Sequence, residues 1–527
     1  MHEDGPKRAV TGTLVKVLVH RRGDRGMVLE PYASRCVRQG EIHELVTTDH
    51  TESAGGTRVD RVGFLGFAEI FSAGVIDRGD QVRIDDRIVG RVLGFDACHF
   101  PNHYNIVIGT DAPRSGLDLG LEPEAQIRFE PAVPAPLPGA AAAEAVPFFD
   151  QAPTFEALWP RIHAHLNEVM DRGKYSHGAK VAELEAALAR WTGGRYVIGV
   201  NSGTDALILL LRACGLQPGD EVVVPAFSFV ASASSVVLAR GRPVFADIDP
   251  VTYAVDPQSV CDAVTSRTSM VMPVHLFCQM ADMEAILELA DRHGLRIVED
   301  SAEAVGMRWN GIHAGLLGAG GVLSFFPTKT LGAIGDAGAV LTNDPEVAEM
   351  AAALRHHGRF GPTLDDFTRI STPTAVSGVN SKMDDIQAAV LLAKLSCLES
   401  DIRRRHELAD AYSERLGGIP GVVALPTIAP RRAETNPVFY VYVVEVERRD
   451  ELARHLARGA VGTEIYYPTP LHLQPCFADL GYRRGDFPHA ELACTRTLAL
   501  PLYPDLSIDG VDRVCDAVRR FFAGGGA

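Results

Sequence analysis

The chain has 527 residues, with 46% hydrophobic and 22% charged residues, a composition typical of a folded protein rather than a disordered one. This length predicts roughly two to four domains. The formal net charge of −16 disfavours binding to duplex nucleic acid, which requires a cationic protein face. Anionic small molecules are not excluded, because a local arginine or a helix N-terminus can outweigh the net charge.

Nine cysteines are scattered along the chain without any C-x-x-C pair. This pattern disfavours a disulfide framework or a zinc ribbon and favours the reducing cytoplasm. The first residues, MHEDGPKRAVTG, lack the apolar run of a secretory signal. Since the sequence also contains no stretch of about 18 apolar residues, we expect a cytoplasmic protein without a membrane-spanning segment.

Residues 1–130 have the character of β-strands. Short runs rich in β-branched residues occur at 13–20, 61–71, 80–95 and 104–110, and turns that contain Gly or Asp separate them. Because helical periodicity is hard to find here, the pattern predicts a small, mostly β barrel or sandwich. The sequence assigns no activity to this domain.

Three potential metal ligands lie close together in this first domain. Cys98, His99 and His103 fall within six positions in DACHFPNHY. No second cluster with a clear spacing follows, and adjacent residues of a strand face opposite ways, which separates Cys98 from His99. We therefore favour a simple turn at PNH between two strands. A small-molecule or partner site is the remaining alternative, and no metal site is expected.

Residues 131–146, PAVPAPLPGAAAAEAV, are dominated by Pro and Ala. This composition predicts a semi-rigid linker between domains, with a short helix in the alanine run as the alternative.

The pattern changes after the linker. Amphipathic helices are predicted at 179–191 and 204–214, and short apolar strands at 221–224, 243–246, 270–274 and 295–298. This alternation predicts a mainly parallel, doubly wound sheet, which binds ligands beyond the carboxyl ends of its strands. Residues 383–416 are predicted to be helical, and the last hundred residues mix strands and helices. We expect a large domain at 147–390 and a smaller α+β domain at 391–527.

Four elements of the large domain carry residues suited to chemistry. Lys329 follows the strand-like run GVLSFF and precedes a Gly-rich turn, and Asp300 follows a buried-looking strand. A lysine held at such a strand end can become a nucleophile, whereas a surface lysine is the simpler interpretation. A buried carboxylate needs a partner, although Asp300 alone is equally compatible with a helix cap.

The other two elements suit a phosphate and an aromatic ring. NSGTDAL at 201–207 opens an apolar helix with a Gly/Ser/Thr turn, whose N–H groups suit a phosphate as well as a plain N-cap. Phe229 follows the next strand, where its ring either fills the core or stacks on a flat ligand.

These elements, in this order, resemble the DegT/DnrJ/EryC1/StrS sugar aminotransferases from about residue 146 to the C-terminus. That family belongs to the fold-type I pyridoxal-phosphate (PLP) enzymes. The resemblance rests on the following motifs: NSGTDAL, GDEVVVPAFSFVAS, PVFADIDPVTY, PVHLFCQMADM, IVEDSAEAVG, LSFFPTKTLGAIGDAGAV, LRHHGR, GVNSKMDDIQAAVL and YYPTPLHLQP.

The resemblance implies a role for each matched residue. Lys329 would form the Schiff base with PLP and move the proton, while Asp300 would pair with the pyridinium nitrogen. Glu303 stands where many members carry Gln near the phenolic oxygen, and a carboxylate there would be repelled unless protonated or turned away. The remaining implied cofactor contacts are a stack on Phe229, phosphate contacts from Ser202, Gly203, Thr204 and Ser324, and Asn380, which reaches the phosphate of the neighbouring subunit.

The resemblance therefore implies a homodimer with shared active sites that transfers an amino group, from glutamate, to a nucleotide-linked keto sugar or a cyclitol. The pathway would be that of a secondary metabolite such as an antibiotic, or of a surface sugar. The presence of Lys329 disfavours the branch that has His there and dehydrates its sugar. The alternatives are a PLP-dependent dehydratase or lyase, and a non-catalytic sensor or scaffold. Cys278 and Lys382 depart from the family pattern near the expected substrate mouth, and Lys382 or Arg355 would supply the cation for a diphosphate.

Overall fold

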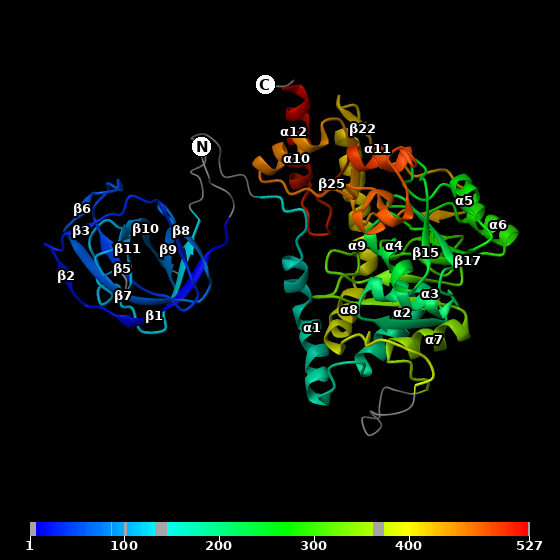
Figure 1. Ribbon diagram of the computed structural model, residues 1–527, viewed down its shortest axis with the longest axis horizontal. Helices are drawn as coiled ribbons and strands as arrows, with labels where there is room; N and C mark the ends of the chain where they lie inside the picture. Colours follow the sequence, from blue (N-terminus) through cyan, green and yellow to red (C-terminus); the bar gives the residue numbers. More distant parts are fainter. Residues whose placement is uncertain (1–6, 86, 100–102, 132–144, 362–373, 525–527) are drawn as a thin grey trace. The chain divides into compact units, whose positions relative to one another are not determined.

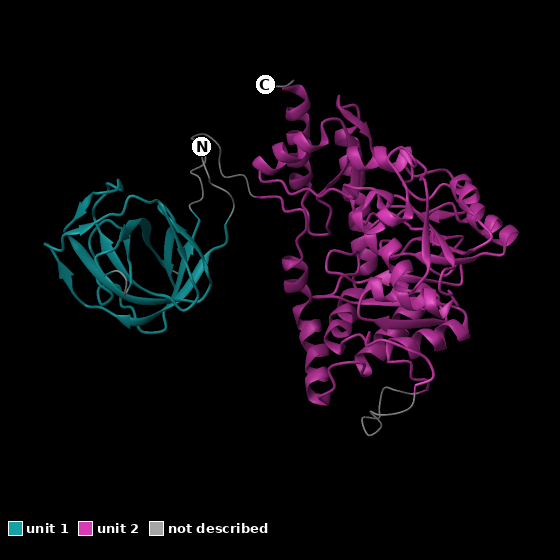
Figure 2. Cartoon of the chain, in the orientation of Figure 1, with its two compact units in different colours: residues 1–142 teal, residues 143–527 magenta. Residues whose placement is uncertain are grey.

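The computed structural model describes residues 7–85, 87–99, 103–131, 145–361 and 374–524. The chain divides into two compact units, residues 1–142 and 143–527, which Figure 2 distinguishes by colour. Most of the predicted linker lies outside the described residues. The expected boundary between a large and a small domain at residue 390 stays a prediction.

The first unit is a closed β-barrel. Among the described residues, seven strands pair in the order β1-β12-β9-β10-β11-β5-β7, and the pairing of β1 with β7 closes the ring that is visible in Figure 1. Their bounds are β1 Val10–Val17, β5 Ile42–Thr48, β7 Val62–Ile70, β9 Gln81–Ile84, β10 Arg87–Asp96, β11 Asn105–Gly109 and β12 Gln126–Glu130. Short strands flank the ring: β2 Arg21–Arg22, β3 Met27–Val28, β4 Ser34–Val37, β6 Arg58–Val59 and β8 Gly74–Asp77.

The core of this barrel consists of aliphatic and aromatic side chains from alternating strand positions, including Leu14, Leu65 and Phe95. Of the two architectures expected from the sequence, the barrel is confirmed. The predicted strand run at 80–95 is a hairpin of β9 and β10, whereas β5 was missed because its sequence, IHELVTT, alternates poorly. Strand β5 pairs in parallel with β11, although the two strands are far apart in the sequence.

The second unit is built on a seven-stranded sheet with the order β13-β21-β20-β17-β16-β14-β15. Pairings among β15, β14, β16, β17 and β20 are parallel, and β21 is antiparallel to both of its neighbours. The mainly parallel sheet predicted from the sequence is thus confirmed. The strand bounds are β13 Tyr196–Val200, β14 Glu221–Pro225, β15 Arg242–Ala246, β16 Thr268–Val271, β17 Arg296–Asp300, β20 Gly320–Ser324 and β21 Gly338–Thr342.

Helices cover both faces of this sheet, as the strand residues show. In β20, Val322 belongs to the core cluster that contains α3, whereas Leu323 belongs to the cluster that contains α2. Because successive strand residues point to opposite faces, α3 and α2 cover opposite sides of β20. The helices of this part are α1 Ala152–Arg172, α2 Ala179–Thr192, α3 Gly203–Ala213, α4 Val230–Leu238, α5 Pro257–Ala263, α6 Met283–His293 and α7 Pro345–Arg355.

The helical region expected at 383–416 is two helices, α8 Asp385–Leu395 and α9 Leu398–Leu416, with a break at Ser396 and Cys397. After them the chain forms a small antiparallel sheet of β22, β24 and β25, and its core includes Tyr412 and Tyr442. The remaining bounds are β18 Arg308–Trp309, β19 Ile312–His313, β22 Val422–Ala424, β23 Thr435–Asn436, β24 Tyr442–Val446, β25 Thr497–Leu500, α10 Arg449–Arg458, α11 Pro488–Arg496, α12 Ile508–Ala523 and two 3-10 helices, η2 Leu471–Leu473 and η3 Pro475–Leu480.

Candidate active site

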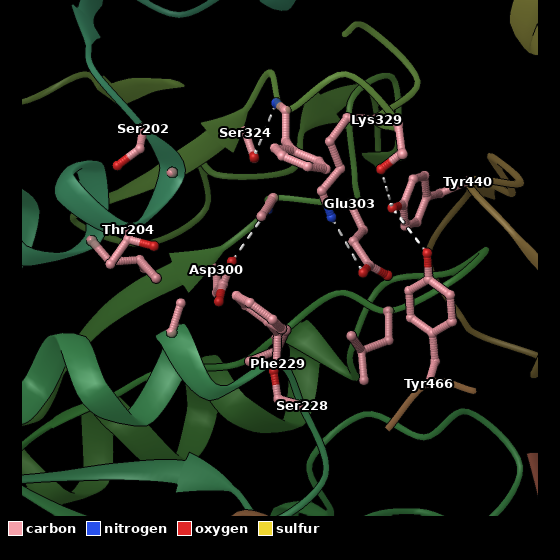
Figure 3. Close-up of a pocket in the computed structure, with 18 of the residues that line it drawn as sticks. Ser202, Thr204, Ser228, Phe229, Asp300, Glu303, Ser324, Lys329, Tyr440 and Tyr466 are labelled. Carbon is pink, nitrogen blue, oxygen red and sulfur yellow. Dashed lines mark hydrogen bonds and ion pairs between the residues drawn. The ribbon is translucent and has the colours of Figure 1, made fainter. Parts of the chain in front are cut away.

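A pocket of about 500 Å³ lies at the carboxyl ends of the sheet strands. Its wall contains eight of the nine site residues that the sequence singled out, namely Ser202, Gly203, Thr204, Phe229, Asp300, Glu303, Ser324 and Lys329. Asn380 is not among the residues that line this pocket. These eight residues come from segments up to 127 positions apart in the chain and face one cavity, as Figure 3 shows.

Lys329 occupies a tight turn after β20. Its backbone N–H donates to the Phe326 carbonyl, and a side chain at Gly332 would come within 2.2 Å of the Pro327 carbonyl oxygen. The Gly-rich sequence after the lysine is thus required by the close approach of two backbone segments. The turn directs the Lys329 side chain into the pocket, where Nζ lies 3.4 Å from Glu303 Oε1 and 4.3 Å from the centre of the Tyr440 ring.

The pKa of Lys329 reflects two opposing effects. Burial disfavours the charged amine, but the electrostatic influence of Tyr440, Glu303 and Asp300 outweighs burial and raises the pKa. The surrounding groups therefore favour the ammonium form of the amine. A cationic ligand ring beside Asp300 would compete for this negative charge and thereby release the ammonium proton.

Asp300 is the last residue of β17 and is 4% exposed. Its Oδ2 accepts a 2.7 Å hydrogen bond from the Ser232 hydroxyl, and its Oδ1 accepts from the Ala302 N–H. Burial raises the pKa of this carboxyl despite these donors. An anionic group buried at a strand end without a cationic side chain in hydrogen-bonding contact is suited to a positively charged ring nitrogen.

Glu303 has its hydrogen-bonding capacity filled by the protein. Oε1 accepts from Lys329 Nζ and, at 3.0 Å, from the Tyr467 hydroxyl, while Oε2 accepts from the Phe277 N–H at 3.1 Å. These donors fix the carboxylate, and Glu303 together with burial raises the pKa of Tyr467 far above its usual value. Glu303 is therefore an acceptor for Lys329 and Tyr467 in this pocket.

The N-terminus of α3 forms the opposite wall. The Ser202 hydroxyl caps the helix by accepting from the Asp205 N–H, and Gly203 and Thr204 begin its first turn. A Cβ on Gly203 would lie 2.9 Å from the Cβ of Ser324, so this position requires glycine where β20 approaches the helix. The unsatisfied N–H groups of the turn and the helix dipole suit a phosphate here.

Phe229 lies at the start of α4, and its side chain is 57% exposed. Its ring centre is 6.3 Å from that of Tyr467, and both residues line the pocket. An exposed aromatic ring at a cavity wall suits stacking on a flat ligand better than core packing, which removes the simpler interpretation of this residue.

Sequence reasoning missed three tyrosines that line the pocket and Ser232, which lies behind its wall. The Tyr440 hydroxyl contacts both Thr328 and Tyr466 at 3.2 Å, and Tyr467 and Ser232 hold Glu303 and Asp300 as described. Tyr466 and Tyr467 lie within the motif YYPTPLHLQP, so a signal was present although no role was assigned. Tyr440 was read only as part of a strand, and nothing local in the sequence identifies it.

Three further residues were expected near the substrate. Arg355 is buried, and its guanidinium contacts Glu185 Oε1 at 2.5 Å and the Gly199 carbonyl, so the structure assigns it a structural pairing instead. Cys278 is buried in the core, away from the pocket wall, and burial raises its thiol pKa to about 12. Neither side chain lines this pocket, and a role of either residue near the substrate stays a prediction.

Asn380 is exposed and Lys382 beside it is half-buried, and Lys382 Nζ donates to Asn380 Oδ1. Burial and the nearby charges of Arg359 and Arg355 lower the pKa of Lys382. Like charges brought together in this way favour the binding of an anion.

The comparison with known proteins agrees with this geometry. Residues 158–519 match the model of the DegT/DnrJ/EryC1/StrS aminotransferase family, and the chain belongs to that family. A relative from Streptomyces venezuelae, a dTDP-3-amino-3,4,6-trideoxy-alpha-D-glucose transaminase, is 41% identical over 376 residues, which cover 71% of this chain and 96% of the relative.

Solved structures extend the comparison to the fold and the cofactor. S. venezuelae DesV, in complex with a ketimine intermediate, matches with a TM-score of 0.67 and 40% identity over 72% of this chain and 99% of that one. NtdA from Bacillus subtilis, with bound cofactor PMP, matches with a TM-score of 0.66 and 31% identity over 73% and 87%. This chain is accordingly a PLP-dependent aminotransferase of fold-type I.

The barrel matches something else. Residues 4–130 match the model of a family of unknown function, DUF6917.

No helix among the described residues is both long and apolar enough to cross a membrane.

Proposed function

We propose that the protein transfers an amino group from glutamate to a keto sugar that is carried on a nucleoside diphosphate, in the biosynthesis of a secondary metabolite or a surface sugar. The observation that carries this proposal is the convergence of Lys329, Asp300 and the N-terminus of α3 on one pocket. The S. venezuelae transaminase, whose name specifies a dTDP-linked amino sugar, supports the choice of acceptor.

The residues of the pocket fit PLP. Asp300 would hold the ring nitrogen, Phe229 would stack on the ring, and Ser202, Gly203, Thr204 and Ser324 would hold the phosphate. When bound, PLP supplies an electron sink that stabilises negative charge on the substrate carbon. The buried and hydrogen-bonded carboxyl of Asp300 keeps a nitrogen beside it protonated, which is the state this chemistry needs.

Lys329 would serve both as the covalent anchor of the cofactor and as the base that removes and returns the proton. Glu303 and Tyr467 orient the amine from one side, and the Tyr440 ring confines it from another. Because the amine is fixed relative to the pocket wall, it delivers the proton to a single face of the substrate carbon, which sets the configuration of the new amine.

We propose that the protein forms a homodimer with two shared active sites. Asn380 lies on an exposed edge outside the pocket wall, which is compatible with a contact to the phosphate bound by the neighbouring subunit. Lys382, beside it, would supply a cation for the diphosphate of the acceptor in this otherwise acidic chain.

A product assay tests the proposal. The PLP-loaded enzyme is incubated with glutamate and a panel of keto sugars linked to dTDP or UDP, and products are identified by mass spectrometry. We expect an amino sugar together with one 2-oxoglutarate for each turnover. Conversion of a sugar without glutamate would contradict transamination and support a dehydratase or lyase. Conversion of a free cyclitol ketone alone would contradict the nucleotide-linked acceptor.

A further inference from the structure

A second group of polar side chains lies in the barrel, outside the site already described. His99 follows β10, His103 precedes β11 and Glu44 lies in β5. The parallel pairing of β5 with β11 sets Glu44 opposite Asn105, and the Glu44 N–H donates to the Tyr104 carbonyl. The fold thus brings the carboxylate beside a histidine pair that is more than 50 positions away in the sequence.

The two histidines contact each other through both backbone and side chain. The His103 N–H donates to the His99 carbonyl at 3.3 Å. His99 Nδ1 lies 3.0 Å from His103 Nε2. Glu44 Oε2 lies 3.8 Å from the first of these nitrogens and 4.0 Å from the second.

These three distances define the space between the ligand atoms. A triangle with sides of 3.0, 3.8 and 4.0 Å has a centre about 2.1 Å from each corner, which is the bond length of Zn²⁺ to histidine nitrogen and carboxylate oxygen. A transition-metal ion at this centre would reach all three atoms without any movement of the backbone.

The buried carboxylate supplies an independent indication. The Glu44 side chain is 7% exposed, and its Oε2 has no hydrogen-bond partner among the residues that the structure describes. Leaving a buried carboxylate oxygen without a partner is costly, and a cation at the centre of the triangle would satisfy it.

We propose that Glu44, His99 and His103 bind one divalent transition-metal ion, such as Zn²⁺, in the barrel. Two nitrogens and one oxygen suit this class of ion, and three protein ligands leave at least one coordination position open. The open position faces the side of His99, whose side chain is 39% exposed, and it takes water or an anionic oxygen ligand.

Arg25 competes with the metal ion for His99. Its Nη2 lies 3.1 Å from His99 Nε2 and contacts Cys98 Sγ at 3.5 Å. Arginine only donates, so in the metal-free state His99 Nε2 accepts and its Nδ1 carries the proton toward His103. On metal binding, the proton moves from Nδ1 to Nε2 through solvent and Arg25 swings away. No net proton is released from His99 in this exchange.

The test uses the full-length protein, freed of metal and titrated with Zn²⁺ alone by calorimetry. We expect one site per chain that weakens by at least about tenfold in His99→Ala and in Glu44→Gln, and that stays unchanged in His50→Ala. His50 is a suitable control because its ring contacts the Arg58 carbonyl in the same barrel and lies outside the triangle. Equal binding by the wild type and the ligand variants, or no binding at all, would overturn the proposal.

Two further measurements separate a lost ligand from a misfolded barrel. Zn²⁺ should raise the unfolding temperature of the wild type more than that of Glu44→Gln, which without metal should unfold at the same temperature as the wild type or a higher one because its unpartnered carboxylate is gone. Arg25→Met removes the competing cation and should bind Zn²⁺ at least as tightly as the wild type. Weaker binding in Arg25→Met would contradict the displacement of Arg25 by the ion.

Discussion

The two units of this chain assemble their polar sites in different ways. In residues 143–527, the eight pocket residues that the sequence singled out lie at the carboxyl end of a strand or in the segment that follows it, so short contiguous motifs carry them, whereas Tyr440, Tyr466 and Tyr467 come from the region after α9. In the barrel, the three ligand atoms come from a turn and from a strand that pairs with it from far away in the sequence. The site residues of the doubly wound sheet can therefore be identified from local motifs. In the barrel, the pairing of distant strands decides which side chains meet, and local motifs do not show this.

We expect the largest loss of activity from a substitution at Lys329. We expect Lys329→Ala to lower transamination by at least about 10⁴-fold, because one residue supplies both the anchor and the base. The visible absorption band of the lysine-linked cofactor should disappear as well. Lys16→Ala, which removes an exposed lysine of the barrel, serves as the control and should retain both properties. Appreciable turnover by Lys329→Ala would contradict the assignment.

Asp300 should have the next largest effect. Asp300→Asn keeps the shape of the side chain but removes the charge that partners the ring nitrogen. We expect kcat/KM to fall by roughly 100-fold, which corresponds to about 3 kcal/mol for breaking a buried charge pair. Ser232→Ala removes only one hydrogen bond to this carboxylate and should cost about tenfold. Equal losses in the two variants would show that geometry, not charge, determines the role of Asp300.

Glu303 should influence how the rate of cofactor loading depends on pH. Its charge contributes to the raised pKa of Lys329, so Glu303→Gln should lower that pKa. Because only the neutral amine reacts with PLP, the rate of cofactor loading should then rise toward its plateau at a lower pH than in the wild type. Glu349→Gln, on an exposed position of α7, is the control. A midpoint that stays or moves to higher pH would contradict the contact between Glu303 and the amine.

Eight of the nine residues singled out in the sequence line the pocket because motif order and strand ends suffice to place them. The supporting residues could not be found in this way. Ser232 acts from within α4, and Tyr440 reaches Lys329 from a segment 111 positions further along the chain. Arg355 and Cys278 lie within motifs, yet both residues are buried and neither lines the pocket.

The barrel shows the same limit more strongly. The sequence placed Cys98, His99 and His103 close together but showed no second ligand cluster, and Cys98 and His99 were expected to face opposite ways, so a turn was the better interpretation. Glu44 lies in the strand that the periodicity missed, and only the parallel pairing of β5 with β11 brings it to the histidines. A ligand set that depends on strand register cannot be read from local spacing.

The smallest expected effect comes from removing the barrel. The S. venezuelae relatives are covered over 96% and 99% of their lengths by about 72% of this chain, so a variant comprising residues 145–527 lacks nothing that they contain. We expect its transamination rate to stay within about twofold of the full chain, while Zn²⁺ binding falls by one site. Both quantities are measured on the same preparation. A tenfold loss of turnover would show that the barrel contributes to catalysis, and retention of the Zn²⁺ site would place the ion outside the barrel. If the shortened variant keeps its transamination rate but loses the Zn²⁺ site, the barrel binds a ligand that transamination does not require.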